Sequence, residues 1–291
     1  MKSPHFDYVK VTSLQQALTL LGEHGDDARI LAGGQTLLAT LNMRLSEPAL
    51  LIDITGLQEL RGIALRGGVL HIGALVTHAQ IEHSALVAEH APLLAAAAPH
   101  IAHRAIRNAG TWGGSIAFAD PAAEWPCCLL ALDGVVLVQG PQGQRRIAAL
   151  DFFQDLYTTA LLPNEVVVGA EVPVATANDG YAFDELARRH GDYAVAGLAL
   201  SVRWNSVVAS DVRIAFLGVG NTPVRARAAE SALRGNAFSA AVVDVAVHAL
   251  QADLDPLPDL TSNSATKRHL AGVLLRRLLA ATQVTRSAIQ A

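Results

Sequence analysis

The chain has only two cysteines, and they are adjacent: Cys127 and Cys128. A disulfide between sequence neighbours is strained, and two thiols cannot supply the four thiolate ligands of an iron–sulfur cluster. We therefore interpret both residues as buried thiols of a core helix, in a protein of the reducing cytoplasm. Any iron–sulfur chemistry linked to this chain must come from another chain.

Long apolar runs and clusters of like charge are also missing. No stretch reaches the ~18 apolar residues that a membrane helix needs, and the longest candidate, 127–138, is interrupted by Asp133 and Gly134. The N-terminus carries one lysine with no apolar core behind it, which predicts no secretory signal. The net charge is −4 and no basic block appears, which argues against nucleic acid as a partner.

Motifs for metal binding and for nucleophilic catalysis are absent as well. His100 and His103 are the only close histidine pair on an expected helix face, and no cysteine or carboxylate completes a metal set. The run 113–117 resembles a nucleophile elbow but lacks its final glycine. There is no P-loop lysine and no GxGxxG after a first strand. We predict no metal site and no catalytic residue in this chain.

Two glycine-rich segments about 75 residues apart are the most informative feature of the sequence. The first segment is 31–37 (LAGGQTL), and the second segment is 107–115 (RNAGTWGGS). Each carries a hydroxyl residue beside Gly-Gly, a composition that lets main-chain N–H groups surround a phosphate. Alone, either segment is equally well explained as a turn that uses glycine for positive φ. Two of them indicate a diphosphate cofactor held from two sides.

Other candidate residues have ordinary structural alternatives. Glu124 can accept hydrogen bonds from sugar hydroxyls, or it can simply be a carboxylate near a helix N-terminus. Ala117 is small enough to let a flat ligand approach the backbone. Tyr193 can stack on an aromatic ring and Asp192 can contact a ring nitrogen, but from the residues alone a charged surface turn at 188–193 is favoured.

Hydrophobic periodicity predicts strands and helices along the whole chain. Strands are expected at 6–9, 29–32, 50–54, 63–65, 69–73, 135–139, 144–148 and 166–172. Helices are expected after Ser13 and Thr77 and at 36–41, 92–103 and 121–132. A polar stretch at 175–180 predicts a domain boundary, followed by strands at 181–188, 194–204 and 212–219 and helices at 226–233, 240–250 and 266–281. Strands followed by helices are typical of an α+β domain.

With these motifs in order, the chain resembles the FAD-binding medium subunit of molybdenum hydroxylases. That group includes aerobic carbon monoxide dehydrogenase, xanthine dehydrogenase and the bacterial N-heteroaromatic hydroxylases. The resemblance covers essentially the whole chain, and it is carried by 32–38, 43–54, 107–115, 119–124, 151–153, 188–194 and 218–225.

The resemblance implies an α+β fold of two domains. Residues 1–176 are expected to form a vanillyl-alcohol-oxidase (PCMH)-type FAD-binding domain of two α/β subdomains, 1–57 and 58–176. Residues 177–291 are expected to form a C-terminal α+β domain similar to that of the carbon monoxide dehydrogenase flavoprotein, with a three-stranded antiparallel sheet and helices.

The resemblance also implies a non-covalent FAD site. The first segment is expected to bind the diphosphate and the ribityl chain, the second segment to close the other side, and Glu124 to bind ribose or ribityl groups. Tyr193 is expected against the isoalloxazine. The full set of implied cofactor-binding residues is Leu31, Ala32, Gly33, Gly34, Gln35, Thr36, Leu37, Ile101, Ala102, Gly110, Thr111, Gly113, Gly114, Ser115, Ala117, Glu124, Val167, Asp192 and Tyr193.

The implied function is electron transfer within a complex. A large molybdopterin subunit oxidises substrate, a small subunit carries two 2Fe–2S clusters, and this chain passes electrons from its FAD to an external acceptor. The implied assembly is an (αβγ)2 heterotrimer pair in the cytoplasm or, through the complex, at the inner face of the membrane. Carbon monoxide, a purine, a nicotine-like N-heterocycle and an aldehyde remain open as substrates. Alternatives are a stand-alone FAD-dependent oxidoreductase of the same fold, and a binding module that has lost FAD.

Three positions depart from the family pattern. Trp112 stands where the family usually has a small or medium aliphatic residue, which predicts a narrower pocket. Gln35 is often His or Ser in relatives, and because an amide is not nucleophilic we expect no covalent flavin attachment there. Residues 265–268 (ATKR) replace a typical Tyr-Arg pair, so no role is transferred to them.

Overall fold

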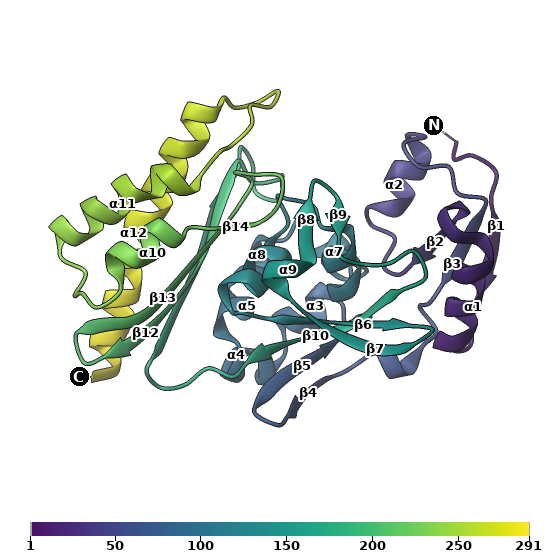
Figure 1. Cartoon of the computed structure of the whole chain (residues 1–291), viewed down its shortest axis with the longest axis horizontal. Coiled ribbons are helices and arrows are strands. Elements are labelled where there is room, and N and C mark those ends of the chain that lie inside the picture. Colours follow the sequence, from purple (N-terminus) through teal and green to yellow (C-terminus); the bar gives the residue numbers. More distant parts are fainter. Residues whose placement is uncertain (1, 291) are drawn as a thin grey trace.

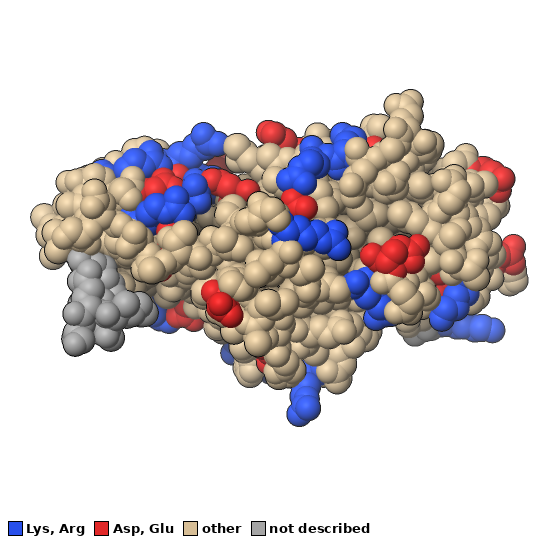
Figure 2. All heavy atoms as spheres, turned by 90° about the horizontal axis from the view of Figure 1, so that it is seen from below, with Lys and Arg blue, Asp and Glu red and all other residues tan. Residues whose placement is uncertain are grey.

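The computed structural model describes residues 2–290, with side chains described through residue 283. Three regions, each built around its own sheet, follow one another along the long axis (Figure 1). The N-terminal region is purple, the central region blue to teal, and the C-terminal region green to yellow. Lys and Arg are interspersed with Asp and Glu on the face seen in Figure 2, and no broad basic patch appears there.

The N-terminal region is a small parallel sheet covered by one helix. Its strands run in the order β1-β3-β2, with bounds β1 (Asp7–Lys10), β2 (Ala28–Leu31) and β3 (Leu50–Asp53). Helix α1 (Leu14–His24) begins as predicted at Ser13, whose side chain accepts the N–H of Gln16. The first glycine segment leaves β2 and leads into the short helix α2 (Leu37–Asn42), so the predicted strand–glycine–helix order is confirmed.

The central region is a five-stranded antiparallel sheet covered by short helices. The sheet order is β4-β5-β10-β6-β7, with β4 (Ile63–Arg66), β5 (Val69–Gly73), β6 (Val135–Gly140), β7 (Gly143–Ala148) and β10 (Val166–Pro173). The strands predicted at 63–65 and 69–73 pair with each other as a hairpin, as do those predicted at 135–139 and 144–148. The helices are α3 (His78–Glu82), α4 (Ala85–His90), α5 (Pro92–Ala97), α6 (Arg104–Arg107), α7 (Trp112–Phe118), α8 (Glu124–Ala131) and α9 (Ala149–Phe152).

Two predicted helices of this region are shorter than expected. The helix predicted over 92–103 ends at Ala97 and continues only as a 3-10 turn to His100, because Pro99 cannot donate a backbone hydrogen bond. The helix predicted from residue 121 begins at Glu124, since Asp120 first forms a turn by accepting the N–H of Ala122 at 2.8 Å. A small hairpin of β8 (Phe153–Asp155) and β9 (Thr158–Thr159) was not predicted.

The C-terminal region is an antiparallel sheet with helices on one face. The three predicted strands are confirmed as β11 (Asp179–Leu186), β12 (Ala196–Asn205) and β13 (Val208–Leu217), and a short fourth strand, β14 (Val224–Arg225), joins the edge. The three predicted helices are confirmed as α10 (Arg227–Leu233), α11 (Ala240–Asp253) and α12 (Ser264–Gln290). Within residues 2–290, no helix is long and apolar enough to cross a membrane.

The central and C-terminal regions share one core. Alternate residues of β12 point to opposite faces: Leu198 and Leu200 pack with the C-terminal helices, while Ala199 joins the central core. Helix α8 packs on the same sheet from the central side. Cys127 and Cys128 lie on α8 and are fully buried, as predicted, and burial raises the pKa of both thiols.

Candidate cofactor-binding site

A cavity of about 800 Å³ lies where the N-terminal, central and C-terminal regions meet. This volume is within the range of small-molecule and cofactor sites, roughly 300 to 1,000 Å³. All of the predicted cofactor-binding residues except Leu31 line the cavity. Leu31 instead ends β2, and its carbonyl accepts the N–H of Ile54 at 3.0 Å.

The first glycine segment presents open backbone donors to the cavity. Gly34 adopts φ +70°, a left-handed conformation that favours glycine. The backbone N–H groups of residues 33–37 donate to no acceptor among the described residues. The Gln35 side chain turns back on its own segment and donates to the Gly33 carbonyl at 3.1 Å. Five consecutive unused donors form a nest-like surface suited to an anion.

The second glycine segment uses its donors internally. Thr111 caps α7, because its Oγ1 accepts the N–H of Gly114 at 3.2 Å and its carbonyl accepts the N–H of Ser115 at 3.0 Å. The N–H groups of Trp112 and Gly113 donate to the carbonyls of Val76 (2.8 Å) and Ala74 (2.9 Å). The sequence predicted a loop with open donors on both sides, and this half of the prediction was wrong because the segment forms a capped helical turn.

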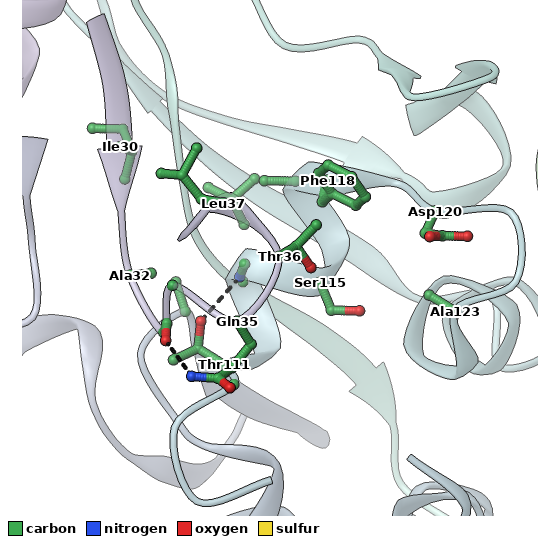
Figure 3. A pocket seen from close by; sticks show the side chains of 18 of the residues that line it. Ile30, Ala32, Gln35, Thr36, Leu37, Thr111, Ser115, Phe118, Asp120 and Ala123 are labelled. Atoms are coloured by element: carbon green, nitrogen blue, oxygen red, sulfur yellow. Dashed lines mark hydrogen bonds between the residues drawn. The ribbon is translucent and has the colours of Figure 1, made fainter. Parts of the chain in front are cut away.

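The two segments touch each other through glycine. A Cβ atom on Gly33 would lie 2.2 Å from the Ala109 carbonyl oxygen and 2.9 Å from Gly110 Cα. A Cβ atom on Gly113 would lie 2.4 Å from the Cβ of Ala74. Figure 3 shows Thr36 and Leu37 of the first segment and Ser115 and Phe118 of α7 on facing walls. Glycine at these positions therefore permits close backbone packing.

Carboxyl groups gather where α7 leads into α8. Asp120 and Glu124 both line the cavity, and burial raises the pKa of each, that of Glu124 to about 7. Behind them, burial and the charge of Glu124 raise the pKa of Glu185 on β11 to about 8. At neutral pH the Glu124 carboxyl exists in both protonation states, so it can donate as well as accept a hydrogen bond.

Aromatic side chains surround another part of the cavity. Tyr193 lines it from the loop before β12 and is 69% exposed, beside the exposed Asp192. Phe118 of α7 and Tyr157 of the β8–β9 turn lie with ring centroids 5.0 Å apart. Tyr157 holds φ +53°, an uncommon conformation for a non-glycine residue. These rings offer flat apolar surface for an aromatic ligand.

The remaining predicted residues form buried wall segments. Ile101 and Ala102 follow α5, and Ala102 adopts φ +43°. Val167 lies on β10 and is 4% exposed. Trp112 does not line the cavity: it is fully buried, with its ring centroid 5.2 Å from that of Trp125. The predicted narrowing of the pocket by Trp112 was therefore wrong, because this side chain points into the core.

Sequence reasoning missed several lining residues that come from separate segments. They include Ile30, Ile54, His78, Ile106, Phe118, Asp120, Tyr157, 161–163, Glu165 and Val166. Ile54 and Asp120 lay in stretches that carried the family resemblance; the others had no motif of their own. Among the described residues, no three His, Cys, Asp or Glu side chains gather closely enough to hold a metal ion.

Family models match nearly the whole chain. Residues 4–175 match the FAD binding domain in molybdopterin dehydrogenase, and residues 181–282 match the CO dehydrogenase flavoprotein C-terminal domain.

Relatives named as dehydrogenase subunits match over the same length. The chain is 41% identical to the 6-hydroxypseudooxynicotine dehydrogenase complex subunit alpha of Paenarthrobacter nicotinovorans, over 96% of this chain and 95% of that protein. It is 38% identical to the carbon monoxide dehydrogenase medium chain of Hydrogenophaga pseudoflava, over 96% of this chain and 97% of that protein.

Solved structures agree with the sequence comparisons. Carbon monoxide dehydrogenase from Hydrogenophaga pseudoflava superposes with a TM-score of 0.95 at 39% identity, covering 98% of this chain and 99% of that chain. Quinoline 2-oxidoreductase from Pseudomonas putida 86 superposes with a TM-score of 0.93 at 34% identity, covering 98% and 99%. This chain therefore belongs to the family of FAD-binding medium subunits of molybdenum hydroxylases, which are oxidoreductases.

Proposed function

We propose that this chain is the electron-transfer subunit of a molybdenum hydroxylase complex. It receives electrons from the 2Fe–2S clusters of a small partner subunit and passes them through FAD to an external acceptor. A large molybdopterin subunit oxidises the substrate. Two relatives support this division of roles, because one is named as a subunit of a dehydrogenase complex and the other as a medium chain.

The residues of the cavity fit FAD. The open N–H groups of residues 33–37 suit the oxygens of a diphosphate, and the hydroxyls of Thr36 and Ser115 can add hydrogen bonds. Ile101 and Ala102 would hold the adenine side and Glu124 the ribose or ribityl hydroxyls. Val167, Asp192 and Tyr193 would adjoin the ring system. Bound FAD supplies the redox chemistry, and the chain supplies binding, orientation and electrostatics.

The single observation that carries this proposal is the run of unused donors in the first segment. Five successive N–H groups without a protein acceptor line a cavity of about 800 Å³, between two regions packed through Gly33. N–H donors without a protein acceptor must be satisfied by water or by a ligand. An anionic group at this position satisfies several donors at once.

The connection between β10 and β11 suggests where the chain divides into two domains. We put the domain boundary between residues 176 and 177, in the short connection between β10 and β11. The FAD-binding domain would comprise subdomains 1–57 and 58–176. We further propose an (αβγ)2 assembly in the cytoplasm or, through the complex, at the inner membrane face. The substrate is determined by the large subunit.

The first experiment measures FAD binding by the purified chain, in its complex, from the flavin absorbance band. Gly114→Asp is expected to abolish binding, because it adds a side chain and a negative charge in the gap toward Ala32, where the diphosphate is proposed to bind. A Cβ at Gly114 would lie 2.8 Å from Thr111 Oγ1 and 4.0 Å from the Ala32 Cβ. The matched control is Gly67→Asp. This adds the same charge at an exposed hairpin turn where a Cβ meets nothing within 4 Å, and Asp tolerates its left-handed φ of +54°.

Two outcomes would count against the proposal. A wild-type complex without flavin absorbance contradicts FAD binding itself. Unchanged flavin content in Gly114→Asp contradicts the placement of FAD between the two segments. Identification of the chains that co-purify with this one tests the proposed large and small subunits independently of FAD.

A further inference from the structure

His78 lies beneath the junction of the two glycine segments. It is the first residue of α3, and its backbone N–H donates to the Gly110 carbonyl at 3.0 Å. Its side chain lines the cavity although the residue is only 6% exposed. A Cβ on Gly110 would lie 2.6 Å from His78 Nε2, so glycine at 110 makes room for the imidazole.

One nitrogen of the imidazole is already engaged as an acceptor. The indole Nε1–H of Trp125 donates to His78 Nδ1 at 2.9 Å, and the two rings meet edge to face. An indole N–H can only donate, so Nδ1 carries no proton. Burial and the positive charge of Arg107 lower the pKa of His78 to about 4, so the ring is neutral at physiological pH. Its one ring proton therefore resides on Nε2.

The other edge of the ring faces Gly110 and the cavity. Nε2 and Cδ2 are the atoms next to the missing Gly110 side chain. The Nε2–H meets no hydrogen-bond acceptor in the part of the chain that the structure describes. A donor without a protein acceptor, on a residue that is 6% exposed and lines the cavity, is suited to an acceptor atom of a ligand there.

The need for such a donor follows from the second segment. The N–H groups of residues 112–115 are consumed within the protein, so this wall lacks the row of donors found in the first segment. His78 Nε2 lies next to Gly110 of the second segment. Gly33 of the first segment packs against the same residue, Gly110. A neutral imidazole N–H and an anionic oxygen form a charge-assisted hydrogen bond.

We propose that His78 Nε2–H donates a hydrogen bond to an anionic oxygen of the FAD diphosphate, and that Trp125 is a positioning residue that fixes the required tautomer. The inference rests on the proposed FAD site and adds a binding residue to it. It gives the buried hydrogen bond between Trp125 and His78 a function in cofactor binding.

The test compares FAD dissociation constants of the wild type and His78 variants, in the complex, by flavin fluorescence. His78→Gln places an amide N–H at about the reach of Nε2 and should bind within about threefold of the wild type. The Asn side chain of His78→Asn carries the same amide as Gln but is shorter, and the Phe side chain of His78→Phe carries no donor. Both variants should bind FAD about 10- to 100-fold more weakly than the wild type. Trp125→Phe should weaken binding by about 3- to 10-fold, because the tautomer is no longer held.

A second measurement begins with the wild type, so its first part does not depend on the folding of variants. In wild-type protein labelled with ¹⁵N-histidine, NMR should show the proton on Nε2 of His78, and this resonance should shift when FAD is added. At saturating FAD, the ³¹P resonances of the bound diphosphate should differ between the wild type and His78→Phe. In Trp125→Phe, a mixture of tautomers is expected.

The outcomes separate the two proposals. If the wild type binds no FAD, the proposed function fails. If the wild type binds FAD and both His78→Asn and His78→Phe bind it equally well, the role of His78 is overturned while the function stands. An Nε2–H resonance that FAD does not shift also overturns the role of His78. Coincident ³¹P resonances place His78 against another part of the cofactor and overturn the diphosphate assignment.

Discussion

The two glycine segments resemble each other in sequence and differ in structure. In the first, the backbone leaves β2, and residues 33–37 keep their N–H groups free of protein acceptors. In the second, Thr111 caps α7, and the N–H groups of residues 112–115 are all used. The same Gly-Gly pattern therefore accompanies free N–H groups on one wall and close helix packing on the other.

The difference shows that glycine composition alone does not define a phosphate site. What matters is whether neighbouring carbonyls or hydroxyls take the donors first. In the second segment the carbonyls of Ala74 and Val76 do so, from the β5–α3 connection. The second wall then offers the Ser115 hydroxyl and the carboxyls of Asp120 and Glu124 instead.

The largest effect is expected from Gly33→Ala, which attacks the contact between the two segments. Its Cβ would lie 2.2 Å from the Ala109 carbonyl oxygen, a backbone atom that cannot rotate away. We expect the free energy of unfolding to fall by about 2 to 3 kcal/mol and FAD affinity to fall more than about tenfold. Urea unfolding and flavin fluorescence measure the two effects.

Gly22→Ala is the matched control for that change. Gly22 lies inside α1 with nothing within 4 Å of its missing Cβ, so alanine should stabilise the helix by about 0.5 to 1 kcal/mol. If Gly33→Ala behaves like Gly22→Ala, the two segments are not in the contact described, and the comparison between them breaks down.

The acidic end of the second wall should make stability depend on pH. The pKa of Glu124 is raised from 4.5 to about 7, mainly by burial, so the folded state binds its proton more tightly than the unfolded state. This contribution to the free energy of unfolding is present at low pH and is lost as pH rises through about 7. Glu124→Gln should therefore stabilise the FAD-free chain at pH 8 by about 2 kcal/mol and change it little near pH 4.5.

Urea unfolding at the two pH values checks this expectation. The exposed Glu23 provides the control, because Glu23→Gln should shift stability equally at both. An equal effect of Glu124→Gln at pH 4.5 and pH 8 would mean that the carboxyl is hydrated rather than buried, and the second wall would then resemble the first more closely.

A pair of threonine variants tests the contrast between the segments directly. Thr111→Val removes the cap of α7 and should lower the free energy of unfolding by about 0.5 to 2 kcal/mol. Thr36 precedes α2 without a side-chain cap bond, so Thr36→Val should leave stability unchanged and weaken FAD binding by about 3- to 10-fold. Thermal unfolding and FAD titration of both variants give the comparison; a loss of stability in Thr36→Val would contradict it.

The smallest effect is expected from Gln35→Ala. The Gln35 side chain is exposed and bonds only to the Gly33 carbonyl of its own segment. Stability should change by less than about 0.5 kcal/mol, and FAD affinity should stay within about twofold. A larger loss of affinity would mean that the side chain, and not only the backbone of the first segment, contacts the cofactor.

Much of the fold was predictable because it depends on local signals. Ser13 identified the start of α1, and alternating apolar residues identified β12 and β13. The errors had one local and one non-local cause. The helix predicted through His103 ends at Ala97, because Pro99 cannot donate a backbone hydrogen bond. The two-residue strand β14 exists only because it pairs with β13. A strand this short has no periodicity of its own.

The candidate site followed the same division. The sequence predicted every residue of the two glycine segments that lines the cavity. It also predicted Leu31, which does not reach the cavity. It missed His78, Phe118 and Tyr157, which come from separate elements and carry no motif. It also placed Trp112 at the pocket, because sequence does not tell which face of a short helix is buried.

The sequence by itself determined the family, the order of elements and the two segments around which the site is built. These depend on residue type and spacing, which can be read along the chain. Only the tertiary structure decided which N–H groups stay free, which carboxyls are buried and which nitrogen of His78 carries the proton. Each of these depends on acceptors, donors and solvent exclusion contributed by residues such as Val76, Trp125 and Glu185, and folding alone brings them into contact.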